Sequence, residues 1–246
     1  MLSRYSNSLV VGLVALVSST AALADDPAGT LVIVDTDDVF VPNGFDDNDE
    51  TLAVLDGYLP SACHKLAFTD TIKDPVTGAT TILQYARKFD GICLQVRVPY
   101  TSEVSLGVMP AGTFKISAKG AAPQDLRVAE ATNAGPDDHL YAPIDAVRVE
   151  RDEVTGSYAA ILDGRFTNRC MHFKEVNVIN SGRTIEILPI IEMDETEADC
   201  GDDRDAPFSY RAALPEGMTA GRHLVHVRSL NGKSANAVFT AAPIAP

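Results

Sequence analysis

The chain contains the same cysteine-framed unit twice. Its four cysteines form two spaced pairs, Cys63 with Cys93 and Cys170 with Cys200. In each pair 30 positions separate the cysteines, and an Asp-Gly dipeptide, at Asp56 and at Asp163, precedes the first cysteine by the same interval. The second copy follows the first at an offset of 107 positions (170 minus 63). This regularity predicts a duplicated domain, and it says little about activity.

The first 24 residues have the pattern of a secretory signal peptide. Arg4 gives a basic start, Leu9 to Val17 form a short apolar run, and Ala22-Leu23-Ala24 is an A-x-A-like end. The apolar run is shorter than the ~20 residues of a membrane span, and no later stretch is long and apolar enough to be one. We therefore expect a periplasmic or secreted protein without a membrane span in the mature chain.

Cysteines of an exported chain are expected to be oxidised. Four cysteines allow three pairings, and the repeat favours Cys63–Cys93 and Cys170–Cys200, one disulfide inside each copy. Closing a loop of this length contributes on the order of 3–4 kcal/mol to stability.

Charge narrows the choice of partners. The whole chain carries 34 acidic and 20 basic residues, and removal of Arg4 with the signal leaves a net charge near −15 (19 minus 34). Such a surface repels nucleic acid, so we predict no nucleic-acid partner.

Short apolar strands separated by turns run through both copies. Alternation marks His64 to Phe68 and Gly112 to Ser117, and Asp74 to Gly78 is a typical turn. Ile92 to Val98 is a further predicted strand. The sequence predicts an all-β chain of two tandem, internally duplicated β-sandwich domains. Their bounds, with the signal and the linker, are 1–24 signal peptide, 25–131 first domain, 132–143 linker and 144–246 second domain.

The segment Pro110-Ala111-Gly112-Thr113-Phe114, followed by alternation, resembles the penultimate-strand region of bacterial immunoglobulin-like and fibronectin-like domains. Ala220-Gly221 begins a matching segment at an offset of 109 (221 minus 112). The resemblance implies immunoglobulin-like sandwiches. The chain has no tryptophan, so the residue that packs on the disulfide of antibody domains is absent.

The densest polar stretch lies between the first two predicted strands and contains Asp46, Asp47, Asn48, Asp49 and Glu50. Calcium prefers six to eight oxygen ligands from carboxylates, amides and carbonyls. The spacing does not fit an EF-hand, because Thr51 stands where the loop glycine is needed. A calcium site is one hypothesis for this stretch, and a solvated acidic turn is the other. No other cofactor is predicted.

Two further groups of side chains were considered as sites. The acidic run from Glu192 to Asp205, around Cys200, is a candidate surface for a cation or a partner. His223 and His226 are potential metal ligands, but a spacing of three places them on opposite faces of a strand.

Sequence signatures of enzymes are missing, including G-x-S-x-G, H-E-x-x-H and phosphate-binding loops. We predict a non-catalytic binding or structural module that contacts a protein or a surface glycan. Two alternatives remain open: a calcium-stabilised adhesion module that uses Asp46 to Glu50, and a hydrolase whose site is assembled from distant residues.

Overall fold

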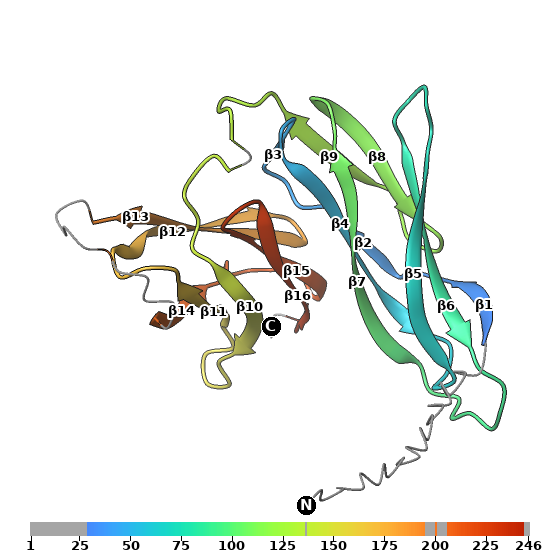
Figure 1. Cartoon of the computed structure of the whole chain (residues 1–246). Helices are drawn as coiled ribbons and strands as arrows, with labels where there is room; N and C mark the ends of the chain where they lie inside the picture. The colour runs from blue at the N-terminus through green and yellow to red at the C-terminus, as the bar shows by residue number, and fades with distance from the viewer. Residues whose placement is uncertain (1–28, 136, 195–199, 201–205, 244–246) are drawn as a thin grey trace, which may run out of the picture.

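The computed structural model describes residues 29–135, 137–194, 200 and 206–243, and every regular element there is a strand (Figure 1). The predicted signal peptide lies outside these residues. The described residues contain no helix long and apolar enough to cross a membrane. The all-β prediction is confirmed.

The N-terminal half, residues 30–129, forms two sheets. Its strands are β1 (Thr30–Val34), β2 (Asp38–Phe40), β3 (Phe45–Asp46), β4 (Glu50–Leu59), β5 (His64–Lys73), β6 (Thr80–Lys88), β7 (Val98–Val108), β8 (Gly112–Ala118) and β9 (Gln124–Ala129). One sheet has the order β1-β6-β8-β9-β3, with β5 on the other side of β6. The second sheet has the order β2-β4-β7.

The C-terminal half, residues 144–241, also forms two sheets. Its strands are β10 (Ile144–Arg151), β11 (Tyr158–Phe166), β12 (Met171–Ser181), β13 (Thr184–Met193), β14 (Ala206–Ala213), β15 (Gly221–Ser229) and β16 (Lys233–Ala241). The sheets have the orders β10-β11-β14 and β12-β13-β15-β16.

The strand pairings repeat between the halves. The order β5-β6-β8-β9 matches β12-β13-β15-β16, and β2-β4-β7 matches β10-β11-β14. The one parallel pair in each four-strand series also matches, since β6 pairs β8 and β13 pairs β15 in parallel. Immunoglobulin sandwiches are built from antiparallel sheets, so these parallel pairs are a departure from that pattern.

Two turns use the same residue pattern to reverse the chain. In the β5–β6 turn the Asp74 carboxylate accepts hydrogen bonds from the backbone N–H groups of Val76 and Thr77, at 2.8 and 3.0 Å. Asp152 does the same in the β10–β11 turn. These backbone donors stabilise the ionised carboxylate and lower the pKa of both aspartates. The glycine that ends each turn, Gly78 and Gly156, has a positive φ of 69° and 75°.

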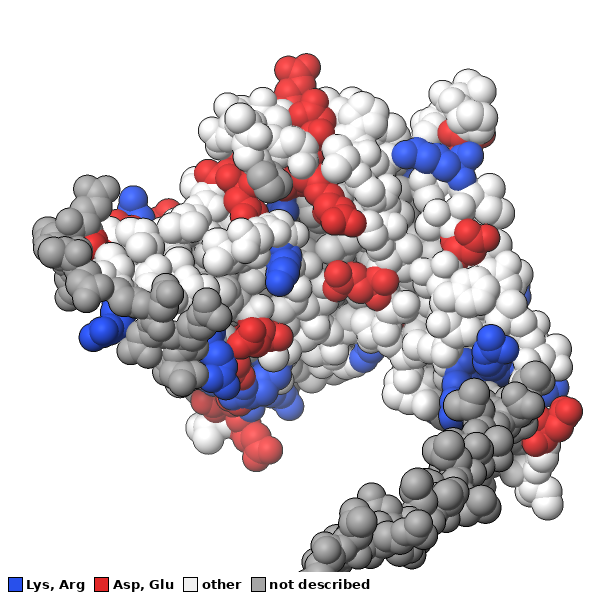
Figure 2. Space-filling view, in the orientation of Figure 1, with Lys and Arg blue, Asp and Glu red and all other residues white. Residues whose placement is uncertain are grey.

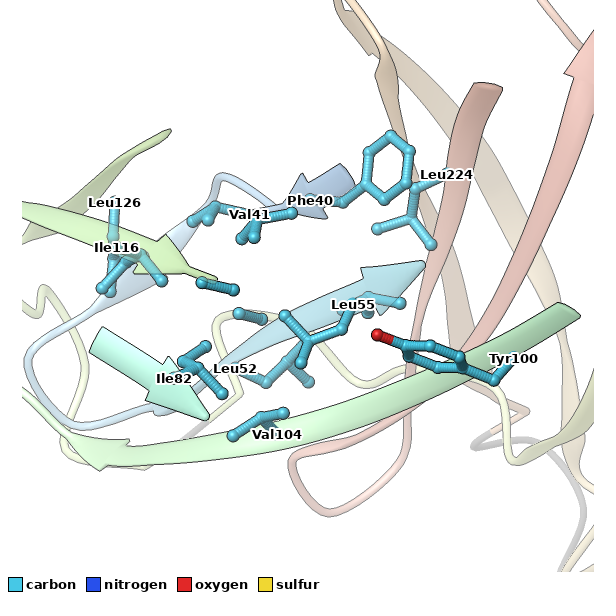
Figure 3. Close-up of a cluster of buried hydrophobic side chains, with 14 of the residues drawn as sticks. Phe40, Val41, Leu52, Leu55, Ile82, Tyr100, Val104, Ile116, Leu126 and Leu224 are labelled. Carbon is cyan, nitrogen blue, oxygen red and sulfur yellow. The ribbon is translucent and has the colours of Figure 1, made fainter. Parts of the chain in front are cut away.

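Each half has a buried apolar core between its two sheets. Leu55, Ile82, Ile116 and Leu126 are fully buried in the first core. Leu224 comes from β15 in the other half and belongs to this cluster, and Figure 3 shows it beside Phe40. Burying a side chain of this size stabilises the fold by about 2 kcal/mol. Because Leu224 of the C-terminal half is buried in the core of the N-terminal half, contact between the halves contributes to the stability of both.

The predicted strand at Ile92 to Val98 is wrong except for its last residue, which begins β7. Residues 89–97 form no ladder, and Ile92 and Leu94 are largely exposed. Apolar alternation alone therefore did not make a strand here.

The disulfides Cys63–Cys93 and Cys170–Cys200 are confirmed. Two disulfides are typical of proteins outside the cytoplasm.

We predict that replacing Cys63 and Cys93 together by serine lowers the free energy of unfolding by about 3–4 kcal/mol, because the open chain regains loop entropy. Urea denaturation of residues 25–246 without reductant measures this loss. The matched pair Cys170 and Cys200 closes a loop of the same length. Its removal is expected to cost at least as much, and a loss below about 1 kcal/mol in either variant would contradict the expectation.

Candidate functional site

Strand β15 is buried on both faces because it lies between the two halves. Side chains at odd positions, such as Val225 and Val227, pack in the C-terminal core. Side chains at even positions face the N-terminal half: Arg222, Leu224, His226 and Arg228. We call this contact between the halves the junction. Its polar groups must find partners there, because water is excluded.

The most buried ion pair of the junction joins Arg228 to Asp49. Their atoms Nη2 and Oδ2 are 2.7 Å apart, and the two side chains are only 7% and 4% exposed. The same nitrogen donates to the Gly44 carbonyl at 2.6 Å, and the guanidinium lies over the Phe45 ring, 4.6 Å from its centre. The cation therefore has an anion, a carbonyl and an aromatic face around it.

A second pair, Arg222 with Asp56, is bidentate. Arg222 Nε donates to Asp56 Oδ2 at 2.8 Å, and Nη2 donates to Oδ1. Hydrogen bonding to Asp56 raises the pKa of Arg222, and the carboxylate is almost fully buried. Because planar guanidinium and carboxylate groups match in one geometry only, this pair orients the halves as well as joining them.

His226 is fully buried in the junction and is held neutral. Asn236 donates through its Nδ2 to Glu103, so its Oδ1 is an acceptor, and the Nδ1–H of His226 donates to it at 2.8 Å. Burial disfavours the charged imidazolium and lowers the pKa of His226 to about 4, and nearby Arg228 acts in the same direction. His223 points the other way, against Phe239, so the predicted opposition of the two histidines is confirmed.

The predicted calcium stretch lies at the edge of the junction, and each of its four carboxylates accepts a hydrogen bond from a protein donor. Asp49 binds Arg228 and the backbone N–H of Asp46. The remaining contacts are Asp46 with the Asn48 N–H, Asp47 with the Ala131 N–H, Glu50 with the Ser105 hydroxyl, and the Asn48 amide with the Asn133 carbonyl. Burial raises the pKa of Asp46, and neighbouring Asp49 adds to this although the Asn48 N–H opposes it.

These contacts favour a structural role for the acidic stretch. Across the described ranges, no group of three or more His, Cys, Asp or Glu side chains is placed to hold a metal ion. The calcium site stays a prediction, which this packing does not favour. In the second acidic run Glu192 contacts His172 at 3.1 Å, while residues 195–199 and 201–205 lie outside the described part.

An open groove of about 940 Å³ lies beside the junction. One wall is β9 with its neighbour Thr113, the floor is the segment from Val39 to Phe45, and the other wall is the β12–β13 turn at Ser181 to Thr184. Glu186 connects the floor to the wall at the β12–β13 turn, because it accepts from the Asn43 N–H and from the Ser181 hydroxyl, both at 2.9 Å. Burial raises the pKa of Glu186, and these two donors act against that rise.

The edge of β9 opens into this groove. Its inner edge pairs with β8 from Gln124 to Val128, but on its outer edge β3 reaches only Val128 and Ala129. Within the described chain, no strand pairs with the outer edge from Gln124 to Arg127, although these residues line the groove. The site therefore offers free backbone groups between two rigid walls.

Comparisons with protein-family models, with curated proteins and with solved structures found no match. The resemblance to immunoglobulin-like and fibronectin-like domains stays a prediction. Sequence reasoning did not find Arg222, Arg228 or the β9 edge. The sequence does contain an indication for the two arginines. Residues 222–228 form a strand with charged residues on one face, and no acidic residue lies near them in the sequence to pair with them.

We predict that Arg228→Met lowers the free energy of unfolding by about 3–5 kcal/mol, because Asp49 would stay buried without its cation. Chemical denaturation measures the loss. The control is Lys115→Met, which removes an exposed pair with Asp125 (side chains 64% and 45% exposed) and is expected to cost at most about 1 kcal/mol. In the double variant Arg228→Met, Asp49→Leu, part of the stability should return. Equal losses in Arg228→Met and the control would refute the buried-pair explanation.

The lowered pKa of His226 predicts that the folded protein loses stability in acid. Its pKa is about 4 in the folded chain and about 6.5 when unfolded, so the unfolded state binds the proton first as the pH falls. Stability is therefore complete above about pH 6.5 and decreases toward pH 4 by about 3 kcal/mol.

The variant His226→Gln lacks this titration, so its unfolding free energy should fall less steeply with pH. Glu186 and Asp46 have raised pKa values and act in the opposite direction, but they are common to both proteins and cancel in the difference. Thr155→Gln, at an exposed site without a titrating group, is the control and should keep the wild-type slope. Identical pH profiles for wild type and His226→Gln would contradict the assignment.

Proposed function

We propose that this chain is an exported, non-catalytic binding module built from two duplicated, immunoglobulin-like β-sandwich domains. The matching strand orders, the disulfide in each half and the predicted signal peptide support this proposal. The parallel strand pair of each half makes the domains a variant of that architecture.

The open edge of β9 in the groove is the observation that carries the proposed function. Edge strands attract other chains, and stable folds usually cover or shorten them. Here the edge is reached through a groove whose walls come from both halves, from Thr113 on one side to Ser181 on the other. A partner seated there contacts both halves at once. The buried pairs of the junction hold the walls at a fixed spacing, so the partner does not have to order them on binding.

The partner in this proposal is a protein. A strand edge presents N–H and C=O groups at the spacing of another polypeptide backbone, whereas binding to a glycan relies mainly on side chains. The groove has a modest charge, with Arg127 and Arg183 near Asp125. The floor contributes apolar surface from Val41.

Site-specific photo-crosslinking in cells that produce the protein tests this function. A photoreactive amino acid in place of Thr113, exposed in the groove, should give a discrete protein adduct. The matched control is Thr155, which is exposed beside a second hollow of about 720 Å³ in the C-terminal half. Adducts from neither position, or equal adducts from both, would contradict a binding site in the groove.

A further inference from the structure

The free stretch of β9 has the length and surroundings of a strand-addition site. From Gln124 to Arg127 it spans about 13 Å, at about 3.3 Å per residue. Among the described residues, no backbone hydrogen bond outside the β8 and β3 ladders satisfies this stretch. Backbone N–H and C=O groups are obligatory hydrogen-bonding groups, so the edge is complementary to an extended polypeptide.

Strand β3 shows that this edge accepts a strand. Phe45 pairs with Val128 and Asp46 with Ala129 in a parallel register. Because β3 runs parallel to β9, the residues before Phe45 lie toward the start of β9, and they form no ladder with Gln124 to Arg127. A segment that enters the groove below β3 would continue the same edge of the same sheet.

Side chains around the open edge indicate the character of the occupant. Successive side chains of a docked strand point alternately into the groove and away from it. Those that point inward would meet the floor, which Val39, Phe40 and Val41 help to line. On the outer face Arg127 is exposed, and no carboxylate within the described residues forms an ion pair with it. The nearby Asp125 is already paired with Lys115, so Arg127 is the available charge.

We propose that the groove binds an extended segment of a partner protein, which pairs with the outer edge of β9 and alternates apolar residues with acidic ones. The apolar residues lie on the floor and an acidic residue reaches Arg127. This inference rests on the proposed binding function and names its mode, strand addition, together with the partner's chemistry.

The probe is an acetylated, amidated peptide of about eight residues that alternates valine and glutamate, within the usual length of a strand. Calorimetry measures its affinity for the chain from residue 25 to 246. Amide hydrogen exchange should slow at 124–127 when the peptide is bound. Two N-methylated versions, one at the valines and one at the glutamates, are the matched controls. In a strand, alternate N–H groups point to opposite edges, so one version must lose binding while the other retains it.

The charge contribution is tested with Arg127→Glu, which is expected to weaken binding of the valine–glutamate peptide about tenfold and to favour a valine–lysine peptide. Lys88→Glu makes the same charge change at an exposed position of β6, outside the groove, and should leave the affinity unchanged. A thermal melt of both variants confirms that they are folded.

The outcomes separate this inference from the function on which it rests. Loss of binding with one N-methylated version only, together with the Arg127→Glu effect, supports strand addition by an acidic segment. Equal behaviour of both N-methylated versions, or equal binding of the valine–lysine peptide, overturns it. If no peptide binds while the Thr113 position still crosslinks to a protein, the binding function stands and strand addition is wrong. If both fail, the binding function is wrong as well.

Discussion

The buried pair between Arg228 and Asp49 is the interaction on which the arrangement of the two halves depends. Taking two charges out of water costs several kcal/mol for each, and only close contact with full hydrogen bonding offsets that cost. The pair meets this condition only when β15 lies against the loop before β4 in one orientation. Any slip would leave a charge unpaired in a dry environment. The cost of ion burial therefore acts as a constraint on orientation, whatever its net effect on stability.

The face of β15 that forms the junction corresponds to a solvent-exposed face in the other half. At the offset of 109, the inward-facing residues of β15 correspond to positions on and just after β8. The pairs are Arg222 with Thr113, Leu224 with Lys115, His226 with Ser117, and Arg228 with Lys119. Lys115 and Lys119 bind exposed carboxylates on their own half. The same strand position thus serves as outer surface in one half and as interior in the other, and the substitutions between the copies match that difference in burial.

Much of the fold was predictable from the sequence, because its signals are local or periodic. The cysteine spacing predicted both disulfides, and alternation with turn residues predicted most strands. The strand at Ile92 was wrong because alternation shows what a segment could do, not whether its apolar side chains are buried, and Ile92 and Leu94 are exposed. The junction was not predicted because Asp49 and Arg228 lie 179 positions apart. The acidic stretch suggested calcium, since composition shows the oxygens and hides the donors that contact them. The free edge of β9 was equally invisible, because it is defined by the point at which β3 begins to pair with β9.

The junction buries one sheet of each half, and other sheet faces of the described residues carry exposed charges. One sheet of the C-terminal half packs on a non-equivalent sheet of the N-terminal half, and contacts of this heterologous kind can recur between molecules, in closed rings or in open arrays. Both end faces carry charges that oppose this. Lys115 and Asp125 cover the N-terminal face that corresponds to the buried one. Arg148, Arg211 and Glu150 cover the outer sheet of the C-terminal half, and Figure 2 shows acidic side chains spread over both halves. Burying either face against another copy would desolvate these charges without the matched partners that Arg228 and Asp49 provide, which makes such stacking costly.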